Sequence, residues 1–177
     1  MDVNNARLIL TEVQSCFQDL KLPFVNESEK LNSCCCANFL NFRSWISKDG
    51  KLAEILTYIY IDYDIVELSM NFYDDSVEVY AGRILEFING INYHIPDSFW
   101  VLYPAKNMLQ YRTAQMITKE TFDKDYFISV LKEFIENGPD DYRYIMRFMK
   151  SDEDLDTVLN EWLNPISIDE VNKGEPA

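Results

Sequence analysis

Four cysteines and one histidine are the side chains of this sequence that could ligate a soft metal or act as a nucleophile. Three cysteines form the run Cys34-Cys35-Cys36, and the fourth is Cys16. Neighbours in an extended chain point to opposite faces, so only Cys34 and Cys36 could share a metal, and structural zinc needs four ligands. His94 has no cysteine or second histidine near it in the sequence. We therefore expect no metal and no cofactor, and interpret the cysteines as reduced, packed thiols, with a redox or metal role of the run as the open alternative.

Carboxylates occur in close pairs, an arrangement that acid–base catalysis can use. The pairs Asp62/Asp64 and Asp74/Asp75 fall where turns or helix starts are expected, and aspartate is favoured there for structural reasons. The group Asp152–Asp156 resembles the start of a calcium loop, but the glycine and glutamate that such a loop needs are replaced. The sequence contains neither a phosphate-binding glycine loop nor a G-x-S-x-G nucleophile motif. We predict that the protein is not an enzyme and has no catalytic residues.

Charge limits the partners of this chain. It has 177 residues, of which 30 are acidic and 16 basic, and the net charge of −14 disfavours nucleic acids and anionic membranes. No apolar run approaches the roughly 18 residues of a membrane span, and the first residues lack the pattern of a signal peptide. We expect a cytoplasmic protein with a single domain over residues 4–164 and a flexible polar tail over residues 165–177.

Hydrophobic periodicity predicts the elements that must position these side chains. Apolar residues at three- and four-residue steps indicate an amphipathic helix over Asn4–Leu20. Strict alternation indicates a strand over Phe39–Ile46. The stretch Leu52–Phe72 has the pattern of an antiparallel hairpin, entered through Asp49-Gly50 and reversed at Asp62-Tyr63-Asp64. We place this hairpin in the middle of a sheet.

The second half of the chain alternates between helices and strands. A helix is expected over Ser76–Ile91, followed by strands over Phe99–Tyr103 and Leu109–Ile117. The next helix should end at Asn137-Gly138-Pro139, and two short helices should fill residues 140–164. The predicted fold class is α+β, with an antiparallel five-stranded sheet in the order α-β-β-β-α-β-β-α plus two short C-terminal helices.

On the predicted strands, several of the residues that alternate with the core-facing ones have large apolar side chains. These are Phe39, Trp45, Leu56, Tyr58 and Tyr60. If helices cover only the opposite face, the five side chains form an exposed aromatic patch, which marks a binding site for a partner. We therefore predict them as partner-binding residues. In the alternative arrangement, the C-terminal helices cover this face as well.

The first predicted strands are preceded by the segment Leu20-Lys21-Leu22-Pro23-Phe24. The second predicted helix is followed by the segment Phe99-Trp100-Val101-Leu102-Tyr103. With the element order of residues 4–137 and the acidity, they resemble the type III secretion chaperone-like fold, which includes the YbjN-like family and CesT-type chaperones. This resemblance implies an acidic, non-catalytic protein that holds a protein partner and forms a homodimer. The dimer helix would present Tyr80, Ile84 and Phe87. The extension after residue 140 departs from the family.

The sequence is compatible with two functions. The first is a non-catalytic protein-binding module, a secretion-chaperone-like or YbjN-like regulator or chaperone that holds a protein partner. The alternative is a bacterial immunity-type inhibitor, whose acidic surface neutralises a basic toxin. The first predicts a homodimer with an apolar groove, and the second predicts a monomer whose association rate falls steeply with salt.

Overall fold

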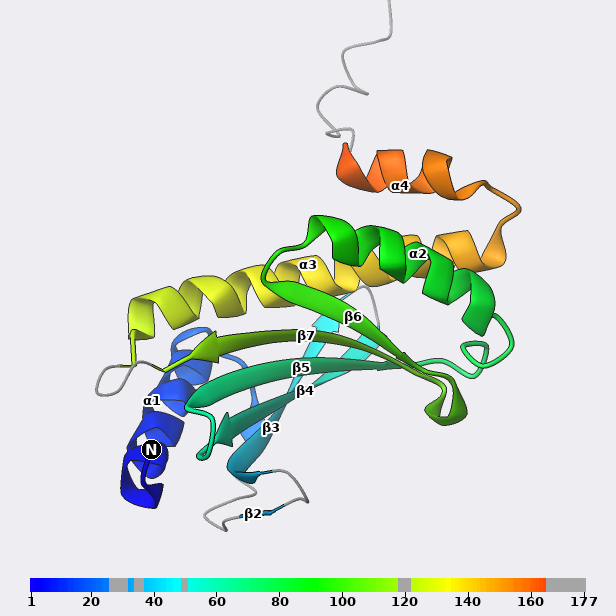
Figure 1. The fold of residues 1–177 in the computed structure, drawn as a ribbon. Coiled ribbons are helices and arrows are strands. Elements are labelled where there is room, and N and C mark those ends of the chain that lie inside the picture. The colour runs from blue at the N-terminus through cyan, green and yellow to red at the C-terminus, as the bar shows by residue number, and fades with distance from the viewer. Residues whose placement is uncertain (26–31, 34–36, 49–50, 118–121, 165–177) are drawn as a thin grey trace, which may run out of the picture.

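The computed structural model describes residues 1–25, 32–33, 37–48, 51–117 and 122–164 (Figure 1). Its helices are α1 (Val3–Asp19), α2 (Ala81–His94), α3 (Lys124–Lys150) and α4 (Leu155–Leu163), and a short 3₁₀ turn spans Pro104–Lys106. Its strands are β1 (Phe24–Val25), β2 (Asn32–Ser33), β3 (Asn38–Lys48), β4 (Lys51–Tyr60), β5 (Ile65–Tyr73), β6 (Ser98–Tyr103) and β7 (Met108–Met116). Within the described part of the chain, no helix is both long and apolar enough to cross a membrane. The α+β class is confirmed.

The strands form one antiparallel sheet in the order β1-β3-β4-β5-β7-β6. The predicted hairpin is confirmed, because Tyr60 of β4 pairs with Ile65 of β5 and the chain reverses between them. Asp64 in this reversal has a positive φ of 53°, which aspartate tolerates better than most residues. Lys48 pairs with Lys51, while the expected turn residues Asp49-Gly50 lie outside the described residues. The hairpin therefore occupies the middle of the sheet.

The predicted number of five strands is wrong. All five long strands are present, but β1 extends the order to six, and β2 pairs with the beginning of β3 off this path. Both added strands have two residues, which is too short to show the period of two that identifies a strand. They are defined by their hydrogen bonding to β3 and not by their own sequence. The run Cys34-Cys35-Cys36 lies outside the described residues.

The apolar face of α1 packs on one face of the sheet, as its periodicity predicts. The side chains of this face are buried: Ala6, Ile9, Val13, Cys16 and Phe17. The helix begins after Asp2, whose carboxylate accepts a hydrogen bond from the backbone N–H of Asn5 at 2.9 Å. Phe17 meets Phe42 of β3 edge to face, with ring centroids 5.0 Å apart. Helix α1 thus covers the β3–β4 side of the core.

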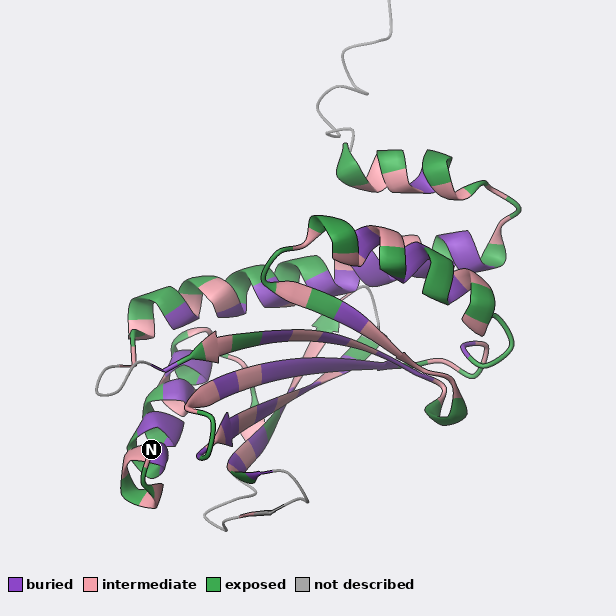
Figure 2. Cartoon of the chain, viewed as in Figure 1, coloured by how far each residue is buried: buried purple, intermediate pink, exposed green. Residues whose placement is uncertain are grey.

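Helix α3 covers the same face farther along the sheet. The ring of Phe134 stacks on Tyr111 of β7 at 5.1 Å, and Tyr142 stacks on Phe72 of β5 at 4.4 Å. Helix α4 lies beyond α2 and α3 as an outer layer and does not reach the sheet (Figure 1). Figure 2 shows the buried residues gathered between the helices and one side of the sheet. The C-terminal helices therefore leave the second face of the sheet open.

The predicted helix end at Asn137-Gly138-Pro139 is wrong, and so is the expected pair of short C-terminal helices. Helix α3 continues through Pro139 to Lys150, so only α4 is short. A proline inside a helix removes one hydrogen bond and disfavours continuation. Here the ring contacts of Phe134 and Tyr142 hold the helix against the sheet on both sides of Pro139. Gly138 serves close packing instead of termination, since a Cβ there would stand 3.0 Å from both Met70 and Tyr111.

Helix α2 begins five residues later than predicted, at Ala81 instead of Ser76. Residues 74–80 form hydrogen-bonded turns, in which the Asp74 carboxylate accepts from the backbone N–H of Ser76 at 3.0 Å. The helix also ends later than predicted, at His94 instead of Ile91, so Gly90 lies inside it. The apolar spacing of this segment fits the turns and the helix equally, because consecutive turns place side chains much as a helix does. Periodicity alone could not place the boundary.

Candidate functional site

The face of the sheet opposite the helices is the candidate site, and we call it the open face. On β4, the residues that alternate with it, such as Ile55 and Ile59, are fully buried. The β4 residues of the open face from Glu54 to Tyr60 are only partly buried, and in Figure 1 helices α2, α3 and α4 lie on the other side of the sheet. Strand alternation therefore decides which side chains a binding partner could reach on the open face. The residues predicted for partner binding all belong to this face: Phe39, Trp45, Leu56, Tyr58 and Tyr60.

Four rings of the open face contact one another, and we call them the aromatic group. Phe39 of β3 pairs across the strands with Tyr60 of β4, and its ring meets Tyr58 at 5.5 Å and Tyr60 at 5.8 Å. Tyr58 and Tyr60 stack at 5.8 Å, and Tyr63 from the β4–β5 turn meets Tyr60 at 6.4 Å. Three of the four predicted aromatic residues, Phe39, Tyr58 and Tyr60, thus touch one another. Tyr63 was missed because a turn residue has no strand parity.

A hollow of about 570 Å³ lies at the other end of the open face. Trp45 and Leu56, the remaining predicted residues, line it, and Tyr58 connects it to the aromatic group. Further walls come from Tyr73, which is largely exposed, and from Lys106 after β6. The structure therefore divides the predicted patch into a ring cluster and a mixed hollow, joined by Tyr58.

The floor of the hollow is a chain of polar side chains that crosses four strands, β7, β5, β4 and β3. Gln110 donates to the amide oxygen of Asn71 at 2.8 Å, and Asn71 donates to the Glu54 carboxylate at 3.1 Å. Arg43 completes the chain with an ion pair to Glu54 at 3.3 Å. Asn71 is 3% exposed, so a missing hydrogen bond there would be costly. Sequence reasoning missed this chain, because alternation marks such residues only as solvent-facing.

A second ion pair lies on the open face beside Tyr58, which pairs across the strands with Glu67. Arg112 of β7 donates to the Glu67 carboxylate at 2.5 Å, and its guanidinium lies 5.4 Å from the ring of Phe99. Ser69 donates to the other oxygen of Glu67 at 2.9 Å. The Nε atom of Arg112 is buried without a hydrogen-bond partner among the described residues. Most charges on this face are therefore already paired within the chain.

Two tyrosines and one lysine provide polar groups that face the hollow. Burial, and then the carboxylates of Glu67 and Glu54, raise the pKa of Tyr58, so its phenol stays protonated and is a potential hydrogen-bond donor. Burial and Glu54 likewise raise the pKa of Tyr73. Among the ion pairs of the described residues, none involves Lys106, whose ammonium lies 5.4 Å from the ring of Tyr103. The hollow thus offers donors and one available cation.

The other side chains with chemical potential have structural positions. Cys16 is fully buried, and burial raises its pKa to about 11, which suppresses the reactive thiolate. His94 lies at the end of α2 between the rings of Tyr93 and Trp162. Asp154 caps α4 by accepting from the backbone N–H of Thr157 at 2.9 Å. Across the described ranges, no three histidine, cysteine or acidic side chains gather as metal ligands.

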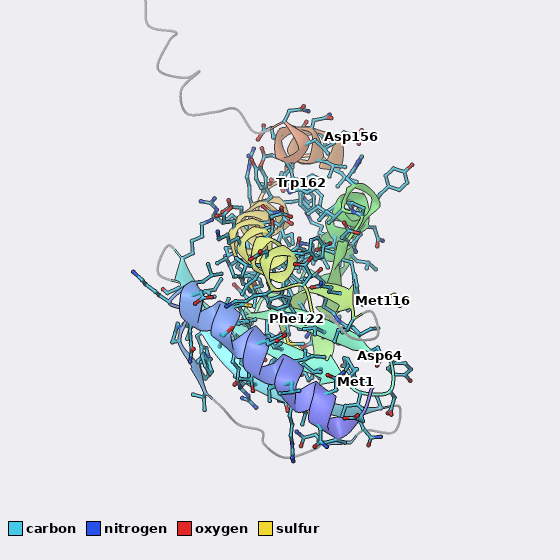
Figure 3. All side chains as sticks on the ribbon, turned by 90° about the vertical axis from the view of Figure 1, so that its left-hand side faces the viewer. Met1, Asp64, Met116, Phe122, Asp156 and Trp162 are labelled. Carbon is cyan, nitrogen blue, oxygen red and sulfur yellow. The ribbon has the colours of Figure 1, made fainter. Side chains whose placement is uncertain are left out.

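The carboxylates that come in pairs hold turns. Asp62 accepts from the backbone N–H of Asn38 at 2.7 Å, and Asp64 forms an ion pair with the amino terminus of Met1. Figure 3 shows Met1 and Asp64 together at this end of the sheet. Asp74 accepts from the turn that precedes α2. These contacts agree with the structural interpretation of Asp62, Asp64 and Asp74.

The residues expected at a dimer helix lie mostly in the core. Ile84 and Phe87 are fully buried, and the ring of Phe87 stacks on Phe148 of α3 at 5.2 Å. Tyr80 precedes α2 and is 41% exposed. Only Tyr80 of the three is therefore accessible to a second copy of the chain without opening the core.

Comparison with protein-family models finds no match, and comparisons with curated proteins and with solved structures find none either.

Proposed function

We propose that this chain is a cytoplasmic, non-catalytic protein-binding module that holds a protein partner on the open face of its sheet, in the manner of secretion chaperones or YbjN-like regulators. The observation that carries the proposal is the aromatic group together with the adjoining hollow. Tyrosine and tryptophan are frequent anchors of protein interfaces, because a rigid ring buries much area at a small entropic cost. Trp45, Tyr58 and Tyr60 provide such anchors on one continuous surface.

The pairing of charges on the open face supports a protein partner that presents both apolar and polar groups. Glu54 and Glu67 are paired with Arg43 and Arg112, so a partner that covers them does not leave these carboxylates unpaired. Lys106 offers a cation at the rim of the hollow. We infer a partner segment that places apolar side chains over the aromatic group and a carboxylate or carbonyl oxygen near Lys106.

The test is quantitative affinity capture from the source cell with the tagged wild type and the double variant Tyr58→Ser/Tyr60→Ser. We expect the wild type to enrich a partner that the double variant loses, and direct titration with the purified partner to reproduce the loss. The matched control is Tyr93→Ser on α2, which removes an 87% exposed tyrosine far from the open face. Thermal melts verify that all variants remain folded. Equal binding by the double variant and the wild type would refute the proposal.

The alternative function gives a different result in the same experiment. A toxin inhibitor with a net charge of −14 should bind a basic partner with an association rate that falls steeply as salt increases. Its binding should depend on acidic side chains and survive the change at Tyr58 and Tyr60. Light scattering adds a second distinction, because the chaperone-like function predicts a dimer and the inhibitor predicts a monomer.

A further inference from the structure

Helix α4 contacts the protein as a bound peptide would. It forms the outermost layer, on α2 and α3, and in Figure 3 Trp162 lies between α4 and these helices. Of its nine residues only Val158 is fully buried. Leu155, Leu159 and Trp162 pack half-buried beside it. These four residues have the spacing i, i+3, i+4, i+7, by which an amphipathic helix anchors in a groove.

The groove beneath α4 is shaped for those anchors. At Gly90 of α2, a Cβ atom would stand 3.1 Å from Cδ2 of Leu159, so the glycine leaves room for the leucine. Asp141 of α3 is 6% exposed, and one of its carboxylate oxygens accepts from the indole N–H of Trp162 at 2.7 Å. The other oxygen accepts from the indole of Trp100 in β6 at 3.1 Å. A buried carboxylate thus depends on a donor that only α4 provides.

Charged groups at the rim of the groove fix the direction of the helix. Arg147 of α3 contacts Glu153 before α4 and Glu161 near its end, the latter at 2.5 Å. Arg83 of α2 donates to the backbone oxygen of Glu153 at 3.0 Å. The contacts of Glu153 are made by the connection at residues 151–154, whereas Glu161 and the four apolar anchors belong to α4 itself. A helix that is not joined to α3 can therefore make the contacts of the anchors and of Glu161.

We propose that the groove between α2 and α3 is a docking site for an amphipathic helix of a protein partner, and that α4 occupies it in the free protein. The incoming helix carries apolar residues at the spacing of α4, an indole or other N–H donor for Asp141, and a carboxylate for Arg147. This site lies apart from the open face, and the inference does not rest on the function proposed for that face.

The test uses the full-length chain with Val158→Asp, which places a charge under α4 and should release it. The probe is a fluorescent peptide of residues 152–164. It should bind this variant, and bind the wild type at least roughly tenfold more weakly, because the tethered α4 competes at an effective concentration on the order of millimolar. A peptide with Leu159→Asp is the matched negative control, and adding Gly90→Val to the variant chain should abolish binding by filling the groove.

Hydrogen exchange on the wild type provides a measurement that does not depend on the peptide. The amides of α4 should exchange at least roughly 100-fold faster than those around Leu131 in α3, since a docked segment opens without global unfolding. Three results would overturn the proposal: equal protection of the two helices, no peptide binding to the variant up to about 1 mM, or a wild-type dimer that disappears with Val158→Asp. The last would assign the groove to the α4 of a second copy.

Discussion

Gly138→Ala should destabilise the protein, although alanine is the better helix former. In the middle of a helix, the change from glycine to alanine gains about 1 kcal/mol from backbone propensity. Gly138 lies inside α3, so this gain applies. Against it stands the added methyl group, which would lie 3.0 Å from Sδ of Met70 and 3.0 Å from Cδ1 of Tyr111. Overpacking of this kind costs about 1–3 kcal/mol.

The neighbours of Gly138 decide which effect prevails. The ring of Tyr111 is stacked on Trp100 at 5.0 Å and on Phe134 at 5.1 Å, so it cannot turn away. Met70 is flexible but fully buried in the same core. The cost should therefore fall in the upper part of its range, at about 2–3 kcal/mol. The net effect is a loss of about 1–2 kcal/mol in the free energy of unfolding.

Gly82→Ala is the matched control, because no atom lies within 4 Å of its added methyl group. It should stabilise the protein by up to about 1 kcal/mol. Urea denaturation measures both changes, and each kcal/mol should move Tm by about 2–4 °C in a chain of this size. A Gly138→Ala variant as stable as Gly82→Ala would refute the reasoning that close packing, and not helix termination, selects glycine at position 138.

Three further predictions concern the core and the α4 contact. Ile59→Asp places an unpaired charge in a fully buried position of β4 and should abolish cooperative unfolding; a near-native thermal melt would contradict the central place of this strand. Trp162→Phe removes the indole donor to Asp141, and this hydrogen bond is worth about 1.5–3 kcal/mol. Amide exchange in α4 should therefore accelerate by roughly tenfold or more. Unchanged exchange would contradict the role of this hydrogen bond. Burial raises the pKa of Asp141, so the wild type gains stability as pH falls through that pKa, whereas Asp141→Asn does not. The difference in Tm, wild type minus variant, should therefore increase from about pH 7 to about pH 4 in calorimetry, and the opposite slope would count against this assignment.

Local pattern was sufficient to predict the elements that bury one face. The apolar steps of α1 predicted its buried side chains, and the alternation in Leu52–Phe72 predicted both strands of the central hairpin. Alternation in Phe39–Ile46 and in Leu52–Phe72 selected Phe39, Tyr58 and Tyr60, which contact one another on the open face. These predictions succeeded because the period of a helix or strand fixes which residues share a face before any packing occurs.

Other features depend on contacts between distant segments. Gly138 and Pro139 favour a helix end locally, but contacts of α3 with β5 and β7 carry the helix through them. The bond from Trp162 to Asp141 joins two helices that sequence periodicity treats separately.

The sequence by itself determined the α+β class, the central hairpin and the side chains of the open face. Only the tertiary structure decided that α4 packs on α2 and α3 and leaves that face uncovered. The physical reason is that periodicity gives each element an apolar face but does not specify the element against which that face packs.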